Sequence, residues 1–311
     1  QPSEELKNMK DKKSISLLAK WLPSINASSS ETKRYAKQIC KAIGATEREY
    51  RKALSMFRKY LDVVEVKMSA KNWSEIKYDA VPSRANLVYN NAFLRNDEER
   101  RRDYLSKLEK GEAKINASVI YPHDIVHKYC NGWRLGKKDS AIEAMWKALP
   151  DTVQGCGNTI VVADGSGSMM TGVGGTKVTA LEVANALAIY FAEHSSGEFK
   201  DKYITFSERP QLVDFSKADS LHDKIQIALR HCEVANTNIE KVFDLILTTA
   251  VKNKMHQEDI PKNILIISDM EFDMATYSYG RGGKVSKRLF DVIAQKYADA
   301  GYQLPRLVFW N

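Results

Sequence analysis

The sequence predicts an α-helical, solenoid-like region followed by a doubly wound α/β domain with a mostly parallel sheet. Helix-capping signals and amphipathic spacing recur before residue 150, whereas apolar runs rich in β-branched residues alternate with helical stretches after it. The excess of positive charge also lies in the first part alone. With 311 residues and 43% hydrophobic content, the chain is long enough for two domains that each bury a core. We therefore predict domains over residues 1–150 and 151–311.

Charge separates the two predicted domains. Residues 1–150 carry 30 Lys and Arg against 19 Asp and Glu, while residues 151–311 carry 17 against 20. A basic module joined to a nearly neutral one is typical of proteins that bind a polyanion, although a solvated helical surface has the same composition. The charge leaves both interpretations of the first domain open.

Capping signals define the helices of the first domain. Ser28 with Glu31 opens one helix that ends at about Gly44, and Thr46 with Glu49 opens another in which apolar residues recur at three- and four-residue spacing. Further helices are expected over residues 5–20, 83–95, 97–110, 123–131 and 139–148. No strand is predicted before residue 151, so the domain is expected to be an array of helices of the solenoid kind.

Apolar runs predict the strands of the second domain. The predicted strands are residues 160–162, 203–206, 264–267 and 307–310, and the predicted helices are residues 177–194, 219–230, 238–254 and 285–299. Continuous apolar strands between amphipathic helices indicate a mostly parallel sheet covered on both faces. In such sheets ligands bind beyond the carboxyl ends of the strands.

Oxygen-bearing side chains follow two of these strands. The first strand ends in Asp164–Ser168 (DGSGS), which puts one carboxylate and two hydroxyls on one tight turn. Asp269 ends a second strand, and Thr237 directly precedes a helix at the same predicted edge. Hard oxygen ligands of this kind are those that Mg²⁺ prefers. The pentapeptide alone also suits an ordinary turn, but the three loops together favour a divalent-metal site.

The three motifs, in this order, resemble the metal-ion-dependent adhesion site of the von Willebrand factor A family. The resemblance implies Mg²⁺, with Mn²⁺ or Ca²⁺ as alternatives, bound through the hydroxyls of Ser166, Ser168 and Thr237. It implies that Asp164 and Asp269 act mainly through bound waters. It also implies an open coordination position that takes an Asp or Glu side chain of a protein partner.

Two features depart from the family pattern. Asn236 precedes Thr237 where the family commonly has a small residue. The family sheet also has one more strand and helix than the residues after Trp310 supply, and the chain has no initiator Met. We therefore expect a fragment whose second domain is truncated at its C-terminus.

Other site patterns are incomplete. Glycine-rich segments near Lys177 and Lys284 do not fit the phosphate-loop pattern, so no nucleotide cofactor is predicted. His123 and His127 have the spacing of a helical zinc motif but lack an identifiable third ligand. Since the hydroxyls have no candidate base and already have a role as metal ligands, we predict that the protein is not an enzyme.

The helical domain carries a second resemblance. Segments Trp73–Ile76, Val81–Ala85 and Tyr121–Val126 resemble a largely uncharacterised family of plants, bacteria and large viruses. That family is related to Ro ribonucleoproteins, in which a ring of helical repeats, the TROVE module, precedes a von Willebrand A domain. The resemblance implies RNA binding on a basic surface, although this helical region is much shorter than that ring.

Lys and Arg residues on the predicted outer faces of the helices are the candidates for contact with RNA. Lys and Arg neutralise phosphates, and aromatic rings stack on unpaired bases. The candidate cations are Lys33, Arg34, Lys37, Arg51, Lys52, Arg58, Lys59, Arg84, Arg100, Arg101 and Arg102, and the candidate stacking residues are Tyr35, Tyr50 and Tyr60. The same residues also suit solvated helix exteriors and packing between helices.

The predicted function is a non-catalytic, Ro-like RNA-binding protein whose metal site binds an acidic group of a protein partner. The alternative is a protein-interaction scaffold that uses the metal without nucleic acid. The four cysteines form no CxxC pair, and no stretch has the length or apolar character of a membrane helix or signal peptide. These features predict a soluble protein of the cytoplasm that does not contact membranes.

Overall fold

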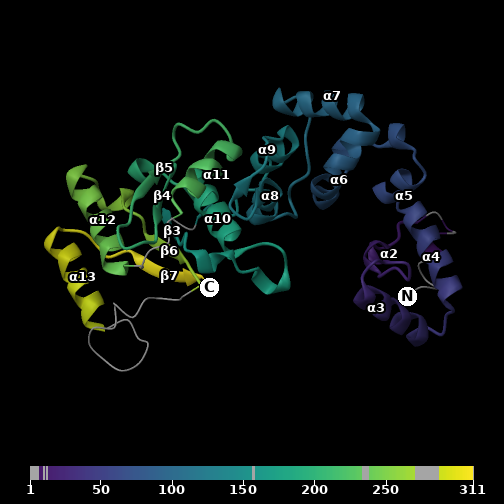
Figure 1. Cartoon of the computed structure of the whole chain (residues 1–311), viewed down its shortest axis with the longest axis horizontal. Coiled ribbons are helices and arrows are strands. Elements are labelled where there is room, and N and C mark those ends of the chain that lie inside the picture. Colours follow the sequence, from purple (N-terminus) through teal and green to yellow (C-terminus); the bar gives the residue numbers. More distant parts are fainter. Residues whose placement is uncertain are drawn as a thin grey trace. The chain divides into compact units, whose positions relative to one another are not determined.

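A computed structural model describes residues 7–9, 11, 13–155, 158–232, 238–269 and 287–310. Its contacts divide the chain into two compact units (Figure 1). The first, called here the helical unit, comprises Gln1–Val81 and Tyr89–Tyr104. The second, the sheet unit, comprises Pro82–Val88 and Leu105–Asn311. The units therefore divide the chain well before residue 150.

Short helices make up the helical unit. They are α2 (Leu18–Trp21), α3 (Ser30–Ala42), α4 (Glu47–Tyr60), α5 (Val64–Ser69), most of α6 (Ser83–Asn96) and the start of α7 (Glu98–Glu109). Ser29, rather than the predicted Ser28, caps α3 by accepting from the Thr32 amide at 3.3 Å. The predicted capping box of Thr46 and Glu49 is present at the start of α4.

Two predictions about the helical unit were wrong or incomplete. The helix expected over residues 5–20 is absent at 13–16, and α2 begins only at Leu18. Helix α5 was not predicted, because six residues are too few to display an amphipathic period. One hydrophobic cluster of this unit gathers the apolar faces of α3 and α4, with Ala36 and Cys40 against Leu54 and Phe57.

The larger sheet of the sheet unit has five strands in the order β5-β4-β3-β6-β7. They are β3 (Thr159–Ala163), β4 (Lys202–Thr205), β5 (Leu212–Asp214), β6 (Asn263–Ile267) and β7 (Arg306–Trp310). All neighbours are parallel except β4 and β5, which form an antiparallel pair. The predicted mixed fold with a mostly parallel sheet is confirmed, whereas β5 was missed because its three residues form no apolar run.

Helices cover both faces of the sheet. Those on one face are α10 (Ala180–His194) and α11 (Leu221–Arg230), and those on the other are α12 (Ile239–Lys252) and α13 (Lys287–Asp299) (Figure 1). Strand β3 shows how one strand serves both faces, since Val161 packs in the cluster with α10 and Val162 in the cluster with α12.

A helix–hairpin–helix segment from the predicted first domain belongs to the sheet unit. It consists of α8 (Pro122–Tyr129), the hairpin of β1 (Cys130–Asn131) and β2 (Arg134–Leu135), and α9 (Ser140–Lys147). The Glu143 carboxylate accepts from the amides of Leu221 and His222 at 2.8 and 3.0 Å, which satisfies the start of α11. The hairpin corrects the expectation that no strand precedes residue 151, because strands of two residues show no alternation.

Helix lengths and cysteines add two facts about the described residues. None of their helices combines the length and apolar character needed to cross a bilayer. Cys40, Cys130 and Cys232 are free thiols, and Cys156 lies outside the described residues.

Candidate metal site and candidate RNA-binding surface

Asp164 lies directly beyond the carboxyl end of β3, and its side chain is held by two donors. Its backbone amide donates to the Ile267 carbonyl at 3.0 Å, which extends the parallel pairing of β3 with β6. One carboxylate oxygen accepts from the Ser268 hydroxyl at 2.7 Å, and the other accepts from the Ser166 amide at 2.9 Å. Asp164 is only 4% exposed. Its carboxylate is therefore fixed in orientation at the sheet edge.

The two loop hydroxyls lie together beside this carboxylate. Ser166 Oγ and Ser168 Oγ are 2.9 Å apart, and Ser168 lies within 3-10 helix η3 (Gly167–Met170). Asp269 follows Ser268 at the end of β6 and is partly buried. The predicted ligand Thr237 lies outside the described residues. The structure thus gathers Asp164, Ser166 and Ser168 at the edge where Asp269 also lies.

The chemistry of these donors suits a hard cation. Every candidate donor is an oxygen, and Mg²⁺ takes oxygen ligands together with several waters. Within the described ranges, no three His, Cys, Asp or Glu side chains gather into a metal-binding group. The candidate site has only two carboxylates, and its other ligands are hydroxyls, so it is not a group of that kind. His127 of the apparent zinc motif instead contacts Glu182, with 2.9 Å between Nδ1 and Oε2.

Cys232, which the sequence did not single out as a site residue, packs against the DGSGS loop. A Cβ atom on Gly165 would lie 2.7 Å from Cα of Cys232, so only glycine fits there. Burial raises the pKa of the Cys232 thiol to about 11; the charge of Asp164 acts in the same direction, and a hydrogen bond with Asn185 opposes it. Cys232 is therefore a neutral packing group. No sequence pattern could have linked Cys232 to a loop so distant in the chain.

The β1–β2 hairpin reaches the same loop. A Cβ on Gly132 would lie 3.3 Å from the terminal carbon of Met170, at the end of η3. Gly132 has a φ of 61°, which favours glycine in the hairpin turn. The end of α11 and this hairpin thus support the candidate metal loop through Gly165 and Met170.

Ser207 adds a further oxygen at the carboxyl edge of the sheet. It follows β4, where the Phe206 amide donates to the Ala163 carbonyl at 2.8 Å. Ser207 is 2% exposed, and its hydroxyl has no hydrogen-bond partner among the described residues. The sequence offered no signal for it, since its burial depends on neighbours from other strands.

Burial corrects two of the predicted RNA contacts. Arg101 has no exposed surface, and its guanidinium carbon lies 4.9 to 5.3 Å from the ring centroids of Tyr78, Phe93 and Tyr104. Tyr50, proposed as a stacking residue, is 4% exposed. Both predictions were wrong, because these side chains fill the interior of the helical unit.

Arg58 and Arg100 each donate a side-chain hydrogen bond to a backbone carbonyl. Arg58 donates to the Leu22 carbonyl and the Ser24 hydroxyl, both at 2.8 Å. Arg100 donates to the Ile76 carbonyl at 2.7 Å and pairs with Asp97 at 2.8 Å. These two arginines stabilise loops of the helical unit as well as carrying charge at its surface.

The other predicted cations are exposed. They are Lys33, Arg34, Lys37, Arg51, Lys52, Lys59, Arg84 and Arg102. Arg84 belongs to the sheet unit, where its guanidinium lies 4.0 Å from the Asp124 carboxylate. Of the two remaining tyrosines, Tyr35 is 46% and Tyr60 is 38% exposed.

One cavity of the helical unit brings three predicted cations together. Arg51, Arg58 and Lys59 line a cavity of about 510 Å³ between α4 and α5. Its polar lining also includes Ser24, Asn26, Ser55, Glu65 and Ser69. Cations and hydroxyls in one open hollow are the groups that bind phosphate oxygens. We call this hollow the basic cavity.

Comparisons with known proteins describe relatives of unknown function. Residues 3–159 match the family described as "Domain of unknown function (DUF2828)", and residues 158–311 match "Domain of unknown function (DUF7788)". Uncharacterized protein L728 of Acanthamoeba polyphaga mimivirus is 31% identical over 330 residues, which cover 96% of this chain and 52% of the relative. The chain thus spans about half the length of that curated relative. These matches fit the predicted link to an uncharacterised family that includes large viruses.

A solved structure is also similar. The Ro (RSR) protein of Deinococcus radiodurans has a TM-score of 0.38 and 15% identity, covering 97% of this chain and 68% of that chain.

The two family matches meet at residues 158–159, which follow α8 and α9 in the chain. The contacts instead group both helices with the sheet.

Proposed function

The chain belongs to the DUF2828 family, and we propose that it is a non-catalytic, Ro-like RNA-binding protein of the cytoplasm. The observation that carries the proposal is the basic cavity, where Arg51, Arg58 and Lys59 converge from one helix face. Phosphate neutralisation by such cations supplies affinity that does not depend on sequence. We therefore expect RNA binding that weakens steeply with salt.

The sheet unit is proposed to be a von Willebrand factor A domain that binds Mg²⁺, with Mn²⁺ or Ca²⁺ as alternatives. Ser166, Ser168 and Thr237 would bind the ion through their hydroxyls, and Asp164 and Asp269 through waters. The geometry of Asp164 supports this role, because its two bonded donors fix the carboxylate at the sheet edge. The ion would supply an electrophilic centre for a carboxylate.

The five residues proposed to hold the ion carry two formal negative charges, those of Asp164 and Asp269. The ion would therefore keep affinity for an Asp or Glu side chain presented by a protein partner. Ser168→Ala removes one hydroxyl and little bulk, so it should weaken both metal affinity and partner binding while the fold persists. Partner capture with Mg²⁺ and with EDTA measures this effect. If the amount of captured partner is the same with EDTA and with Ser168→Ala, the metal has at most a structural role.

A protein-interaction scaffold without RNA is the second candidate. The observation that favours it is the use of Arg101 and Arg58 in packing and loop stabilisation. Part of the positive charge would then serve the fold, and the remainder would keep the surface solvated.

Salt-dependent RNA binding separates these two functions. The affinity of the 311-residue chain for a structured RNA is measured over a salt series. Each phosphate contact contributes about 0.7 to 0.9 to the log–log slope, so the double variant Arg51→Ala, Lys59→Ala should lower the slope by about 1.5. Lys52→Ala is the matched control, since Lys52 is exposed on the same helix and does not line the cavity. Wild-type protein that binds no RNA at low salt would exclude the RNA-binding function and leave the scaffold as the favoured candidate.

A further inference from the structure

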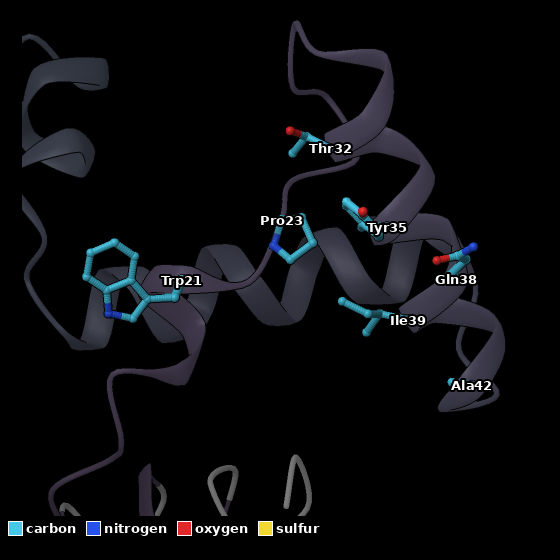
Figure 2. Close-up of a pocket in the computed structure, with 7 residues that line it drawn as sticks. All are labelled: Trp21, Pro23, Thr32, Tyr35, Gln38, Ile39 and Ala42. Atoms are coloured by element: carbon cyan, nitrogen blue, oxygen red, sulfur yellow. The ribbon is translucent and has the colours of Figure 1, made fainter. Parts of the chain in front are cut away.

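A second cavity of the helical unit lies against helix α3 and has a different lining. Its volume is about 640 Å³, within the range of small-ligand sites. Figure 2 shows Pro23 between Trp21 at the end of α2 and the α3 side chains of Tyr35 and Ile39. Thr32, Gln38 and Ala42 complete the lining. We call this cavity the aromatic groove.

Two large aromatic side chains of the groove are open to solvent. Trp21 is 69% exposed and Tyr35 is 46% exposed. Tryptophan is usually buried to a high degree, so an exposed ring that lines a cavity is typical of a binding surface. The Tyr35 hydroxyl donates to the Glu31 carboxylate at 3.1 Å, which restricts the ring without covering it. Both rings offer flat apolar surface to a ligand.

The charge around these rings selects an anionic ligand. Lys20 Nζ lies 5.3 Å from the Trp21 ring centroid, and the Arg34 guanidinium lies 5.2 Å from that of Tyr35. Helix α3 also carries Lys33, Lys37 and Lys41. Glu31 lies 3.9 Å from Arg34 and Glu47 lies 3.3 Å from Lys37, so cations still outnumber carboxylates along this helix. A ligand that matches this groove combines flat aromatic groups with negative charge.

We propose that the aromatic groove binds unpaired bases of single-stranded RNA. Bases stack on Trp21 and Tyr35, and the surrounding cations contact the flanking phosphates. The Gln38 amide forms hydrogen bonds with the edges of the bases. The proposal rests on the proposed RNA-binding function and assigns the single-stranded part of the ligand to this groove. None of the described residues that line the basic cavity is aromatic, so it serves the phosphates of paired and unpaired RNA alike.

A proline-rich peptide is another ligand that aromatic-lined grooves accept. Such a peptide has no charge that matches Lys20, Arg34 and the lysines of α3. The cations therefore favour the nucleic acid.

The test compares the affinities of a labelled oligouridine and a labelled RNA duplex, measured by fluorescence anisotropy with the 311-residue chain. Base stacking contributes about 1–3 kcal/mol per base, so Trp21→Ala and Tyr35→Ala should each lower oligouridine affinity by roughly tenfold. Duplex affinity should not change. Trp21→Phe and Tyr35→Phe retain a ring and should retain most of the oligouridine affinity.

Matched controls guard against effects on folding and on tryptophan content. Trp133→Ala removes a 45% exposed tryptophan of the sheet unit and should leave both affinities unchanged. Because Trp21 and Tyr35 are exposed, their variants should melt at the wild-type temperature.

The possible failures are distinguishable. Absence of any RNA binding by the wild type would remove the proposed function and this inference together. Binding of both RNAs that Trp21→Ala and Tyr35→Ala leave unaltered would overturn the groove assignment alone. The assignment would also fail if a labelled polyproline peptide bound and lost its affinity on Trp21→Ala while oligouridine affinity stayed constant.

Discussion

Polar groups at the carboxyl edge of the sheet bond mainly to one another, whereas the cations of the helical unit are divided between its interior and its surface. Asp164 accepts from Ser268 and from the Ser166 amide, which come from two different strand ends. In the helical unit, Arg101 is enclosed by aromatic rings while Arg51 lines an open cavity. The topology of a parallel sheet brings groups from distant segments to one edge. On a helix, by contrast, residues of the same type are buried or exposed according to which neighbours pack against them.

Replacing Arg101 should give the largest loss of stability. It tests the distinction between buried and exposed cations in the helical unit. Arg101→Ala leaves a void among the three rings and removes the donors to Asn90 Oδ1, the nearer at 2.9 Å. We expect a loss of about 3 kcal/mol or more in the free energy of unfolding. Urea denaturation measures this loss. Arg102→Ala is the control, since Arg102 is exposed and pairs only with Glu98 in the described contacts; equal stability of both variants would contradict the assignment.

Metal removal tests the sheet edge. Mg²⁺ at about 100 times its dissociation constant should stabilise the folded protein by about 2.7 kcal/mol, because the unfolded chain has no site. EDTA should abolish the gain. Asp164→Asn should also abolish it while preserving most of the side-chain volume. Identical thermal melts of the wild type with Mg²⁺ and with EDTA would argue against a metal at this edge.

Two neighbouring glycines offer a matched test of the packing behind the metal loop. Gly165→Ala forces a methyl group toward Cys232 and should destabilise the protein by about 1–3 kcal/mol, with weaker Mg²⁺ stabilisation. Gly167→Ala should be nearly neutral in stability, because no atom of the described residues beyond its chain neighbours lies within 4 Å of the added carbon. Melting temperatures with and without Mg²⁺ compare the two. If Gly165→Ala proved as benign as Gly167→Ala, the support from Cys232 would be unimportant.

Acid sensitivity should show the smallest effect. Hydrogen bonds from the backbone and side chain of Thr46 lower the pKa of the exposed Glu49 carboxyl. A carboxyl with a lower pKa in the folded state contributes stability above its unfolded pKa, and that contribution is lost as pH falls through the folded value. Glu49→Gln should therefore slightly reduce stability at neutral pH and flatten its decline in acid. Denaturation of both proteins over a pH series measures the difference, and parallel curves would contradict it.

The sequence by itself determined the main elements of both units. Thr46 and Glu49 marked the start of α4 because a capping box is a local interaction, and the apolar runs marked β3 and β6 because buried parallel strands need continuous apolar residues. The loop position of Asp164 followed from the same local pattern. Ser29 in place of Ser28 shows the limit of that precision at a helix end.

Only the tertiary structure decided which residues meet across the chain. The joining of α8 and α9 to the sheet depends on Glu143 bonding the start of α11, and the burial of Arg101 depends partly on the ring of Tyr78, which precedes it by 23 residues. The contact of Gly165 with Cys232 likewise joins two distant loops. These partners are distant in sequence and show no periodic spacing, so their meeting becomes visible only when the chain is folded.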